Sequence, residues 1–590
     1  MRLNSQWWGQ EPQLCRREPS LITTEGLSVS IRVLLMVAGC CCLGLVSGVP
    51  ASAKKKTVES AAASFQKEIP KEQRTEQALN RLTFGPRPGD AARVESMGLK
   101  KWIDLELHPN RIPENPVLLE KLKDLDSLSM SSREIVQNYP APQMVRAMVN
   151  GWAPFPTDPE RRIVIQKLVQ RFERKQQTGQ DPPGPDVTGL LSRDQMKMLR
   201  TGTPPQRLAV FDAIPADKQN DVIPELPADV LQALFAAAPP DQRRKFELAA
   251  GPQQVVARDL AEGKLLRAIY SNRQLEEVLV DFWFNHFNVY LDKGADHYLV
   301  TAYERDVIRP HVLGKFRDLL EATAKSPAML FYLDNWQSVG AAGRRPVRRG
   351  LNENYGRELM ELHTLGVDGG YTQKDVTEVA RCFTGWTIKQ PQMGGEFEFN
   401  PKTHDDGEKT VLGVKIPAGG GIRDGEKVLD IVSRSPATAR FLSRELATRF
   451  VADDPPASLV DRMSRTFLKT DGDLRAVMKS MLESKEFWSA GAYRSKTKSP
   501  LEMVASAVRA VDGDVDFAFA LTNQVAQMGE PLYRKLEPTG YSNSSKEWMN
   551  SAGLLARMNF GLNLASNHVQ GVKVEGADGI VLGSPEFQKH

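Results

Sequence analysis

The stretch from Asn352 to Trp386 is the most informative in the chain, because its apolar and polar positions predict two amphipathic helices joined by a glycine-rich turn. Taking about 100° per residue, we find one apolar stripe along a predicted helix, at Leu351, Tyr355, Leu359 and Leu362. A polar stripe lies on one flank of that helix, at Asn354, Glu358 and Glu361. The pattern predicts a helix with Asn352 as its N-cap and Gly366 just past its end.

Polar chemistry is concentrated on this first helix. Glu358 lies almost inside the apolar face, so its carboxylate needs a partner or takes a raised pKa. Either Glu358 pairs with a buried arginine and fixes the packing, or it belongs to a ligand-binding or catalytic site. His363 falls about 140° from Glu358, so the two cannot hold one ion from this helix alone. Asn354, Arg357 and His363 are the candidate ligand-binding residues of the segment.

A second helix is predicted to follow a glycine-rich connection. Thr372 to Asp375 has the form of a capping box with aspartate in the last place, and apolar residues then recur at helical spacing up to Phe383. Gly366, Gly369 and Gly370 allow positive φ in the connection. No GxGxxG or GxxxxGK[ST] pattern surrounds them, so we interpret these glycines as turn residues.

An aromatic helix is predicted between Gln274 and Tyr290. Its apolar face is formed by Leu275, Val278, Leu279 and Phe282. His286 lies at the centre of that face and has Asn285 and Asn288 beside it. His286 is interpreted either as a core histidine with satisfied hydrogen bonds or, because of the two asparagines, as a ligand to a metal or substrate.

The hydrophobic period changes to two between Phe397 and Val414, which predicts a β-hairpin arm near 396–416. Residues 403–407 read as its turn, so His404 and Asp405 are expected at an exposed tip. Elsewhere helical spacing dominates. The predicted fold is mostly α, a multi-helix globular domain with a small β-hairpin arm and a Pro-rich helical insert.

Shifts in composition predict the organisation of the chain. The predicted segments are a signal peptide at 1–53, a flexible lead-in at 54–74, an N-terminal helical part of the core at 75–109, a variable Pro-rich helical insert at 110–252, the main α-helical core at 253–568 and a C-terminal tail at 569–590. Disorder is expected within the insert near 175–190.

The N-terminal segment indicates export. An uncharged, mostly apolar run from Val33 to Val49 lies between Arg32 and the sequence Ala51-Ser52-Ala53, as in a cleavable signal peptide. The mature chain would begin near Lys54, in a periplasmic or extracellular location. Lipidation at Cys40 and an uncleaved N-terminal anchor are two alternatives, and Met36 is an alternative start. No membrane span is expected after cleavage.

Charge and cysteine content narrow the function further. The net charge of +4 over 590 residues gives no argument for a nucleic-acid partner. Four of the five cysteines lie in or before the leader, at Cys15, Cys40, Cys41 and Cys42. Cys382 is then the sole cysteine of the mature chain, which excludes an intramolecular disulfide and a cysteine-based zinc site. Cys382 is interpreted as a small buried residue.

Several segments together resemble the bacterial family named domain of unknown function 1800. They are NRLTFGPRPGD (80–90), FWFNHFNV (282–289), NENYGRELMELHTLGVDGGYTQKDV (352–376), ARCFTGW (380–386), HDDGEKTVLG (404–413), FLSRELATRFV (441–451) and GLLARMNF (553–560). The resemblance runs from about residue 76 to about residue 568, with the insert at 110–250 looking unlike the family's linker. It implies an exported, largely helical bacterial protein and no known reaction.

Two functions follow from these observations. The first is an exported binding or assembly factor of the cell envelope, whose partner is another exported protein. The second is a metal- or acid/base-dependent hydrolase with a site built from His286, Glu358 and His404. In that case Glu361 joins Glu358 and His286 as a catalytic candidate, and a divalent metal would be held by His286, His404 and Asp405.

Overall fold

The computed structural model describes residues 63–151, 153–178, 191–223, 226–340, 350–575 and 579–590. The predicted signal peptide, its cleavage site and Cys40 lie outside these ranges, as does most of the segment expected to be disordered. The described chain is mostly helical, and its strands form three two-stranded sheets, so the predicted fold class is confirmed. Within these ranges no helix is both long enough and apolar enough to cross a membrane.

The N-terminal part of the core consists of α2 (Lys71–Leu82), α3 (Asp90–Met97) and α4 (Leu99–Glu106). Arg81 of α2 is buried and donates to the main-chain oxygens of Val451 and Ala492, which ties this helix to distant segments. The predicted flexible lead-in is wrong from residue 63 onward. The amide of Ile69 donates to Trp488, and α2 begins inside the segment.

The predicted insert contains nine described helices, several of which begin with proline in the first turn. They are α5 (Pro116–Lys123), α6 (Ser132–Asn138), α7 (Pro142–Val149), α8 (Pro159–Thr178), α10 (Arg193–Thr201), α11 (Pro204–Asp212), α12 (Ala216–Val222), α13 (Ala228–Ala237) and α14 (Pro240–Ala250). Leu118 and Leu125 belong to the main hydrophobic cluster, so the first part of the predicted insert packs on the core. Two smaller hydrophobic clusters contain other buried apolar residues of these helices.

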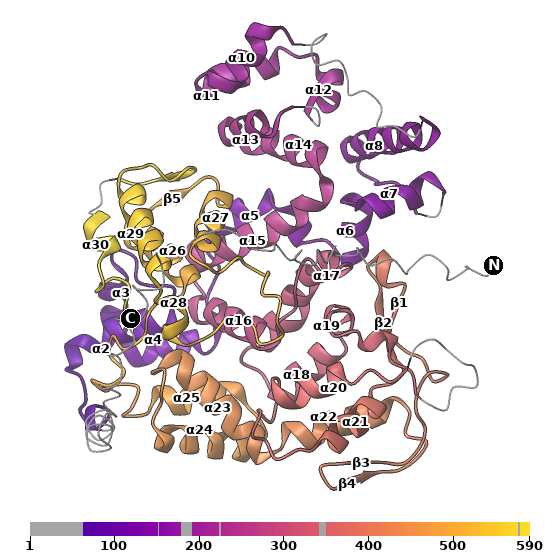
Figure 1. Cartoon of the computed structure of the whole chain (residues 1–590). Helices are drawn as coiled ribbons and strands as arrows, with labels where there is room; N and C mark the ends of the chain where they lie inside the picture. Colours follow the sequence, from indigo (N-terminus) through magenta and orange to yellow (C-terminus); the bar gives the residue numbers. More distant parts are fainter. Residues whose placement is uncertain (1–62, 152, 179–190, 224–225, 341–349, 576–578) are drawn as a thin grey trace, which may run out of the picture. The chain divides into compact units, whose positions relative to one another are not determined.

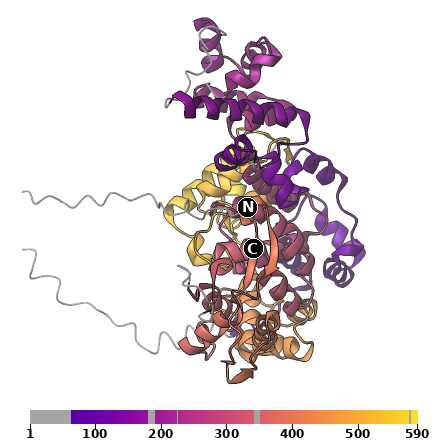
Figure 2. The ribbon, with the colours of Figure 1, turned by 90° about the vertical axis from the view of Figure 1, so that its right-hand side faces the viewer.

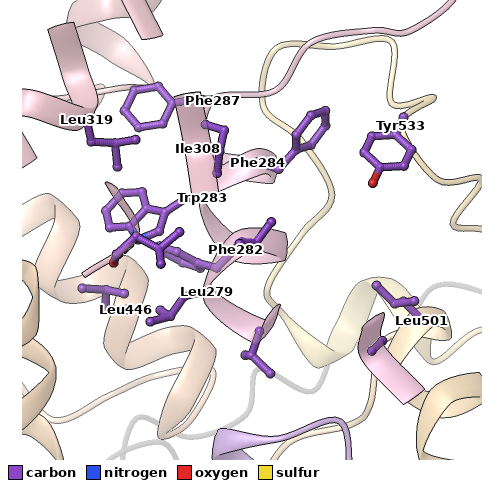
Figure 3. Close-up of a cluster of buried hydrophobic side chains, with 14 of the residues drawn as sticks. Leu279, Phe282, Trp283, Phe284, Phe287, Ile308, Leu319, Leu446, Leu501 and Tyr533 are labelled. Atoms are coloured by element: carbon purple, nitrogen blue, oxygen red, sulfur yellow. Dashed lines mark hydrogen bonds between the residues drawn. The ribbon is translucent and has the colours of Figure 1, made fainter. Parts of the chain in front are cut away.

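The main core is built on α15 (Pro252–Tyr270) and α16 (Gln274–His286), followed by α17 (Asp296–Ala302), α18 (Phe316–Ala324) and α19 (Pro327–Tyr332). Aromatic side chains of α16 point to several sides of the helix (Figure 3). Phe284 packs edge-on against Tyr533, with ring centroids 5.0 Å apart, while Trp283 is fully buried on another side. This all-round burial follows from the apolar run along the helix.

Helix α20 (Asn354–Glu361) and helix α21 (Gln373–Cys382) form the predicted helical pair. The capping box between Thr372 and Asp375 is present. Asn352 accepts a hydrogen bond from the amide of Asn354 at 2.9 Å, one residue outside the N-cap position. Cys382 is a free, buried residue, and burial raises the pKa of its thiol to about 12. The interpretation of Cys382 as a packing residue is consistent with this burial.

Two hairpins replace the single arm that the period-two pattern predicted. Strand β1 (Trp386–Lys389) pairs with β2 (Glu396–Phe399), and β3 (Lys409–Val411) pairs with β4 (Val414–Ile416). The segment expected to be the turn, residues 403–407, joins the two hairpins instead. His404 and Asp405 are 6% and 8% exposed, so the prediction of an exposed tip is wrong. Contacts with α21 and with α22 (Ile422–Ser433) hold this segment in the interior.

The second half of the core contains α22 (Ile422–Ser433), α23 (Pro436–Phe450), α24 (Ala457–Lys469) and α25 (Leu474–Leu482). Helices α23 and α24 pack side by side, as do α24 and α25, and this orange segment stays together in two views (Figures 1 and 2). The remaining helices are α26 (Pro500–Ala510), α27 (Phe519–Gln527), α28 (Ser545–Trp548), α29 (Ser551–Ala565) and α30 (Gly579–Gly583).

The segment predicted as a C-terminal tail is part of the fold. Strand β6 (Val572–Lys573) pairs with β5 (Asp514–Val515). At its end His590 exchanges two main-chain hydrogen bonds with Lys496. Short helical turns complete the described chain, at Pro109–Arg111, Asp126–Leu128, Tyr303–Ile308, Arg309–His311, Asn335–Gln337 and Pro391–Met393.

Candidate ligand-binding site

A cavity of about 660 Å³ lies between α16, α23 and the segment that ends in α28. Its aromatic lining is formed by Phe282, Phe441, Tyr541 and Trp548. Its polar lining includes Asn285, His286, Glu445, Thr448, Lys535, Thr539, Ser542, Asn543, Ser544 and Glu547. Such a volume and mixture of groups is typical of sites that bind small molecules.

His286, at the end of α16, is the predicted site residue that lines this cavity. Its Nε2 lies 3.1 Å from the main-chain oxygen of His363. A carbonyl oxygen only accepts, so Nε2 carries the proton and Nδ1 keeps its lone pair. The hydrogen bond that the His286 ring makes with the described residues is this one, through Nε2, which leaves Nδ1 without a partner among them. Burial lowers the pKa of His286 to about 4, so the imidazole is neutral at pH 7.

Asn285 binds the loop that contains Gly540 and Tyr541, which forms the wall of the cavity opposite α16. Its Oδ1 accepts a hydrogen bond from the amide of Tyr541 at 3.1 Å, and its Nδ2 donates to the main-chain oxygen of Asp281. Gly540 has φ +65°, and a Cβ at this position would lie 2.1 Å from the main-chain oxygen of Asn285. The loop therefore approaches α16 so closely that only glycine fits.

Glu445 of α23 supplies a carboxyl group to the cavity. The side chain is half-buried, and burial raises its pKa, while Arg444 and a hydrogen bond from Asn543 act in the opposite direction. Lys535 lies on the loop wall and its Nζ is 3.0 Å from Glu537. The cavity thus offers a neutral imidazole, a carboxyl group and an amine among hydroxyls, amides and aromatic rings.

The acids of α20 lie outside the lining of this cavity. The side chain of Glu358 is half-buried, and its carboxyl group has no hydrogen-bond or ion-pair partner among the described residues. The buried arginine expected as its partner is absent from that part of the chain. Burial and the neighbouring Glu361 raise the pKa of Glu358, as the sequence pattern predicted. The Glu361 carboxylate accepts a hydrogen bond from Tyr371 at 3.4 Å.

The other polar residues of α20 bond locally. Asn354 is exposed and donates to the main-chain oxygen of Leu333 at 3.4 Å. Arg357 donates to Gln373 at 3.0 Å and lies 3.5 Å from Glu353. These contacts join α20 to α21 and to the preceding loop, and Asn354 and Arg357, like the two acids, are not part of the cavity lining.

His363 is 2% exposed and packs against Phe287, with ring centroids 5.0 Å apart. His363 follows the end of α20 at Glu361, so the angular count along that helix does not apply to it. The amide of His363 donates to Glu358 five residues back, so the turn is wider than an α-helical turn. Burial and the nearby His286 lower the pKa of His363 to about 3.

His404 and Asp405 belong to a buried ionic cluster. The Nε2 of His404 lies 3.2 Å from Asp424, which also accepts from Lys409 at 2.6 Å. Asp405 accepts from Arg381 at 2.9 Å, which holds its pKa below the usual value. These contacts connect the segment before β3 to α21 and α22. They account for His404, Asp405 and Lys409 of the HDDGEK motif as structural contacts.

The predicted metal-binding set is not assembled. Across the described ranges, no three or more histidine, cysteine, aspartate and glutamate side chains are arranged to hold a metal ion. His286 contacts His363, whereas His404 contacts Asp424. The site residues that the sequence analysis missed are Glu445 and the loop at 535–548. Glu445 lies between Leu442 and Leu446 in an apolar stripe, the same signal that drew attention to Glu358.

Fold and cavity together define a mostly α-helical globular protein with a polar and aromatic cavity between α16, α23 and the segment that ends in α28. The family model described as Protein of unknown function (DUF1800) matches residues 77–588, and the chain belongs to that family. The match spans the predicted insert and continues beyond residue 568, further than the motifs alone indicated. No curated protein and no solved structure matches the chain.

Proposed function

We propose that the protein is an exported binding protein of the cell envelope that takes a small polyhydroxylated ring compound, such as a mono- or disaccharide, into the cavity beside His286. The observation that carries this proposal is the unpartnered Nδ1 of His286 in a cavity of about 660 Å³. Segments 282–289, 441–451 and 535–548 meet there, although they are distant in the sequence.

The lining suits such a ligand. Hydroxyl groups of a sugar both donate and accept, and they would find an acceptor in Nδ1 of His286, a carboxyl group in Glu445 and an amine in Lys535. Aromatic side chains such as Phe441 and Tyr541 present flat apolar surfaces to the ring. The volume lies within the roughly 300–1,000 Å³ of small-molecule sites.

The experiment is saturation-transfer difference NMR with a panel of mono- and disaccharides. At least one sugar is expected to bind the wild type saturably and to lose about tenfold or more in affinity in His286→Ala and in Glu445→Gln. His568→Ala changes an exposed histidine and serves as the matched control. Equal binding by His286→Ala and the wild type, or no binding by any sugar, would contradict the proposal.

Export is the second part of the proposal, and it rests on the apolar run at Val33–Val49 and the following Ala51-Ser52-Ala53. Mass spectrometry of the chain secreted by a bacterial host is expected to give Lys54 as the first residue. A chain that begins with a lipid-modified Cys40 would support a membrane-anchored form, and an intact N-terminus would contradict cleavage.

An acid/base hydrolase is the alternative function. It is favoured by the presence of a neutral imidazole and of a carboxyl group with a raised pKa in one cavity, at His286 and Glu445. Glu358 and His404, the other members of the set predicted from sequence, do not line this cavity. Hydrolysis of a bound disaccharide that is lost in both His286→Asn and Glu445→Gln would favour this function over binding alone.

A further inference from the structure

A second cavity of about 520 Å³ lies where α13 and α14 meet α15 and residues 515–518. None of its lining residues lines the first cavity. Six of the lining residues are acidic, namely Glu120, Asp124, Glu247, Asp259, Glu262 and Asp516, against three basic residues. Acids therefore outnumber bases in the lining, although Asp516 also pairs with Lys573 at 2.8 Å and Glu120 with Lys123 at 2.5 Å, both outside the lining.

Each of the three basic residues bonds to a group other than Glu262. Arg244 bonds to Asp259 at 3.0 Å and to Glu247 at 3.1 Å. Lys121 pairs with Asp514, which is outside the cavity lining, at 3.0 Å. The third, Arg243, lies over the ring of Phe517 and donates to the main-chain oxygen of Asp516, at 3.3 Å. None of the three forms an ion pair with Glu262.

Glu262 is a buried acid of the cavity whose carboxyl group lacks a partner in the described part of the chain. It is 8% exposed, in the middle of α15, and its carboxyl group forms no hydrogen bond or ion pair with any described residue. Burial, together with the nearby Glu247 and Asp259, raises its pKa to about 8, against the opposing effect of Arg244 and Arg243. A buried carboxyl group without a partner is costly and requires an explanation.

We propose that this cavity binds a short polyamine, with one ammonium group donating to Glu262 and the others neutralising the acids at the cavity wall. An ammonium group supplies three donors and a compact charge, which matches an acceptor that lacks a partner. A metal ion fits less well, because within the described ranges no three ligating side chains are arranged around a common point. The volume of about 520 Å³ is large enough for a short aliphatic chain with several ammonium groups.

The proposal is tested by isothermal titration of the full chain with spermidine at low ionic strength. Saturable binding is expected, with a dissociation constant about tenfold larger or more in Glu262→Gln and a smaller increase in Asp516→Asn. Glu408→Gln removes an exposed acid away from the cavity and should bind like the wild type. Binding that is equally strong in Glu262→Gln, or no saturable binding, would overturn the proposal.

Proton release gives a second measurement on the wild type. Glu262 is mostly protonated at pH 7 in the free protein, so a bound ammonium group should displace a proton. Titrations in two buffers of different ionisation enthalpy detect this release. Because Glu262 has no partner, Glu262→Gln should melt near the wild-type temperature. A strongly destabilised variant together with no proton release would show that Arg243 pairs with Glu262 instead, and would overturn the proposal.

Discussion

The Nε2–H group of His286 donates a hydrogen bond to the main-chain oxygen of His363 over 3.1 Å. Both histidines attracted attention in the sequence, one in an aromatic helix and one after a helix of acids. The contact joins the side chain of His286 to the main chain of His363, not to its ring. His363 contributes its carbonyl oxygen and a buried ring, while His286 presents its other nitrogen to the cavity. The main-chain oxygen of His363 thus orients the ring of His286.

Gly540→Ala should lower the free energy of unfolding by about 2–4 kcal/mol, because a left-handed φ and a backbone clash with Asn285 act together. Gly370→Ala is the matched control, since Gly370 also has positive φ, +80°, but nothing lies within 4 Å of its added Cβ. We expect a cost of about 1 kcal/mol there. Urea denaturation of both variants measures the difference, and equal costs would contradict the close approach.

Lys409→Met should destabilise the fold by about 3–5 kcal/mol, because it leaves the buried carboxylate of Asp424 without its strongest partner. Arg434→Met breaks the exposed ion pair with Asp471 and should cost less than about 1 kcal/mol. Chemical denaturation compares the two. If Lys409→Met were as stable as the control, the HDDGEK motif would need a role other than packing.

The buried His363 should make stability fall as the pH falls. Its folded pKa is about 3, below the unfolded value of about 6.5, so the unfolded state binds the proton first. The loss begins as the pH falls towards about 6.5, and we expect a loss of about 2 kcal/mol from this residue between pH 7 and pH 5. Carboxyl groups with raised pKa, such as Glu262, act in the opposite sense.

The comparison is therefore made between variants. His363→Leu should lose less stability than the wild type between pH 7 and pH 5, by about the same 2 kcal/mol. His568→Leu, at an exposed position, should follow the wild type. Urea denaturation midpoints at several pH values measure this difference. If the midpoints of His363→Leu and of the wild type changed in parallel with pH, the lowered pKa of His363 would be refuted.

Arg557 and Arg449 are both buried arginines, but only Arg449 is paired, with Glu502. The guanidinium nitrogens of Arg557 have no partner in the described chain. Arg557→Met should leave stability unchanged or raise it, whereas Arg449→Met should cost about 3–5 kcal/mol by stranding Glu502. Thermal melting measures both. A loss above about 2 kcal/mol for Arg557→Met would show that this side chain has a bound partner in solution.

Local patterns predicted the helices well where a cap and an apolar stripe agreed. The capping box at Thr372 starts α21 as expected, and Gly366 takes positive φ after α20. The hairpin prediction failed at 403–407 because a period of two in the sequence does not specify which strands pair. There, His404 and Asp405 find buried partners on α21 and α22, and these contacts outweigh turn formation.

Periodicity, capping residues and composition, which are properties of neighbouring positions, were enough to predict a mostly helical fold and a desolvated Glu358. The export signal lies outside the described residues and stays a prediction. They also placed His286 among the candidates. Which candidates share a cavity depends on contacts between distant segments. His286 meets Glu445 and the loop at Gly540 through packing across the core, and no local pattern encodes that distance. The separation of Glu358 and His404 from the cavity was likewise decided by tertiary packing.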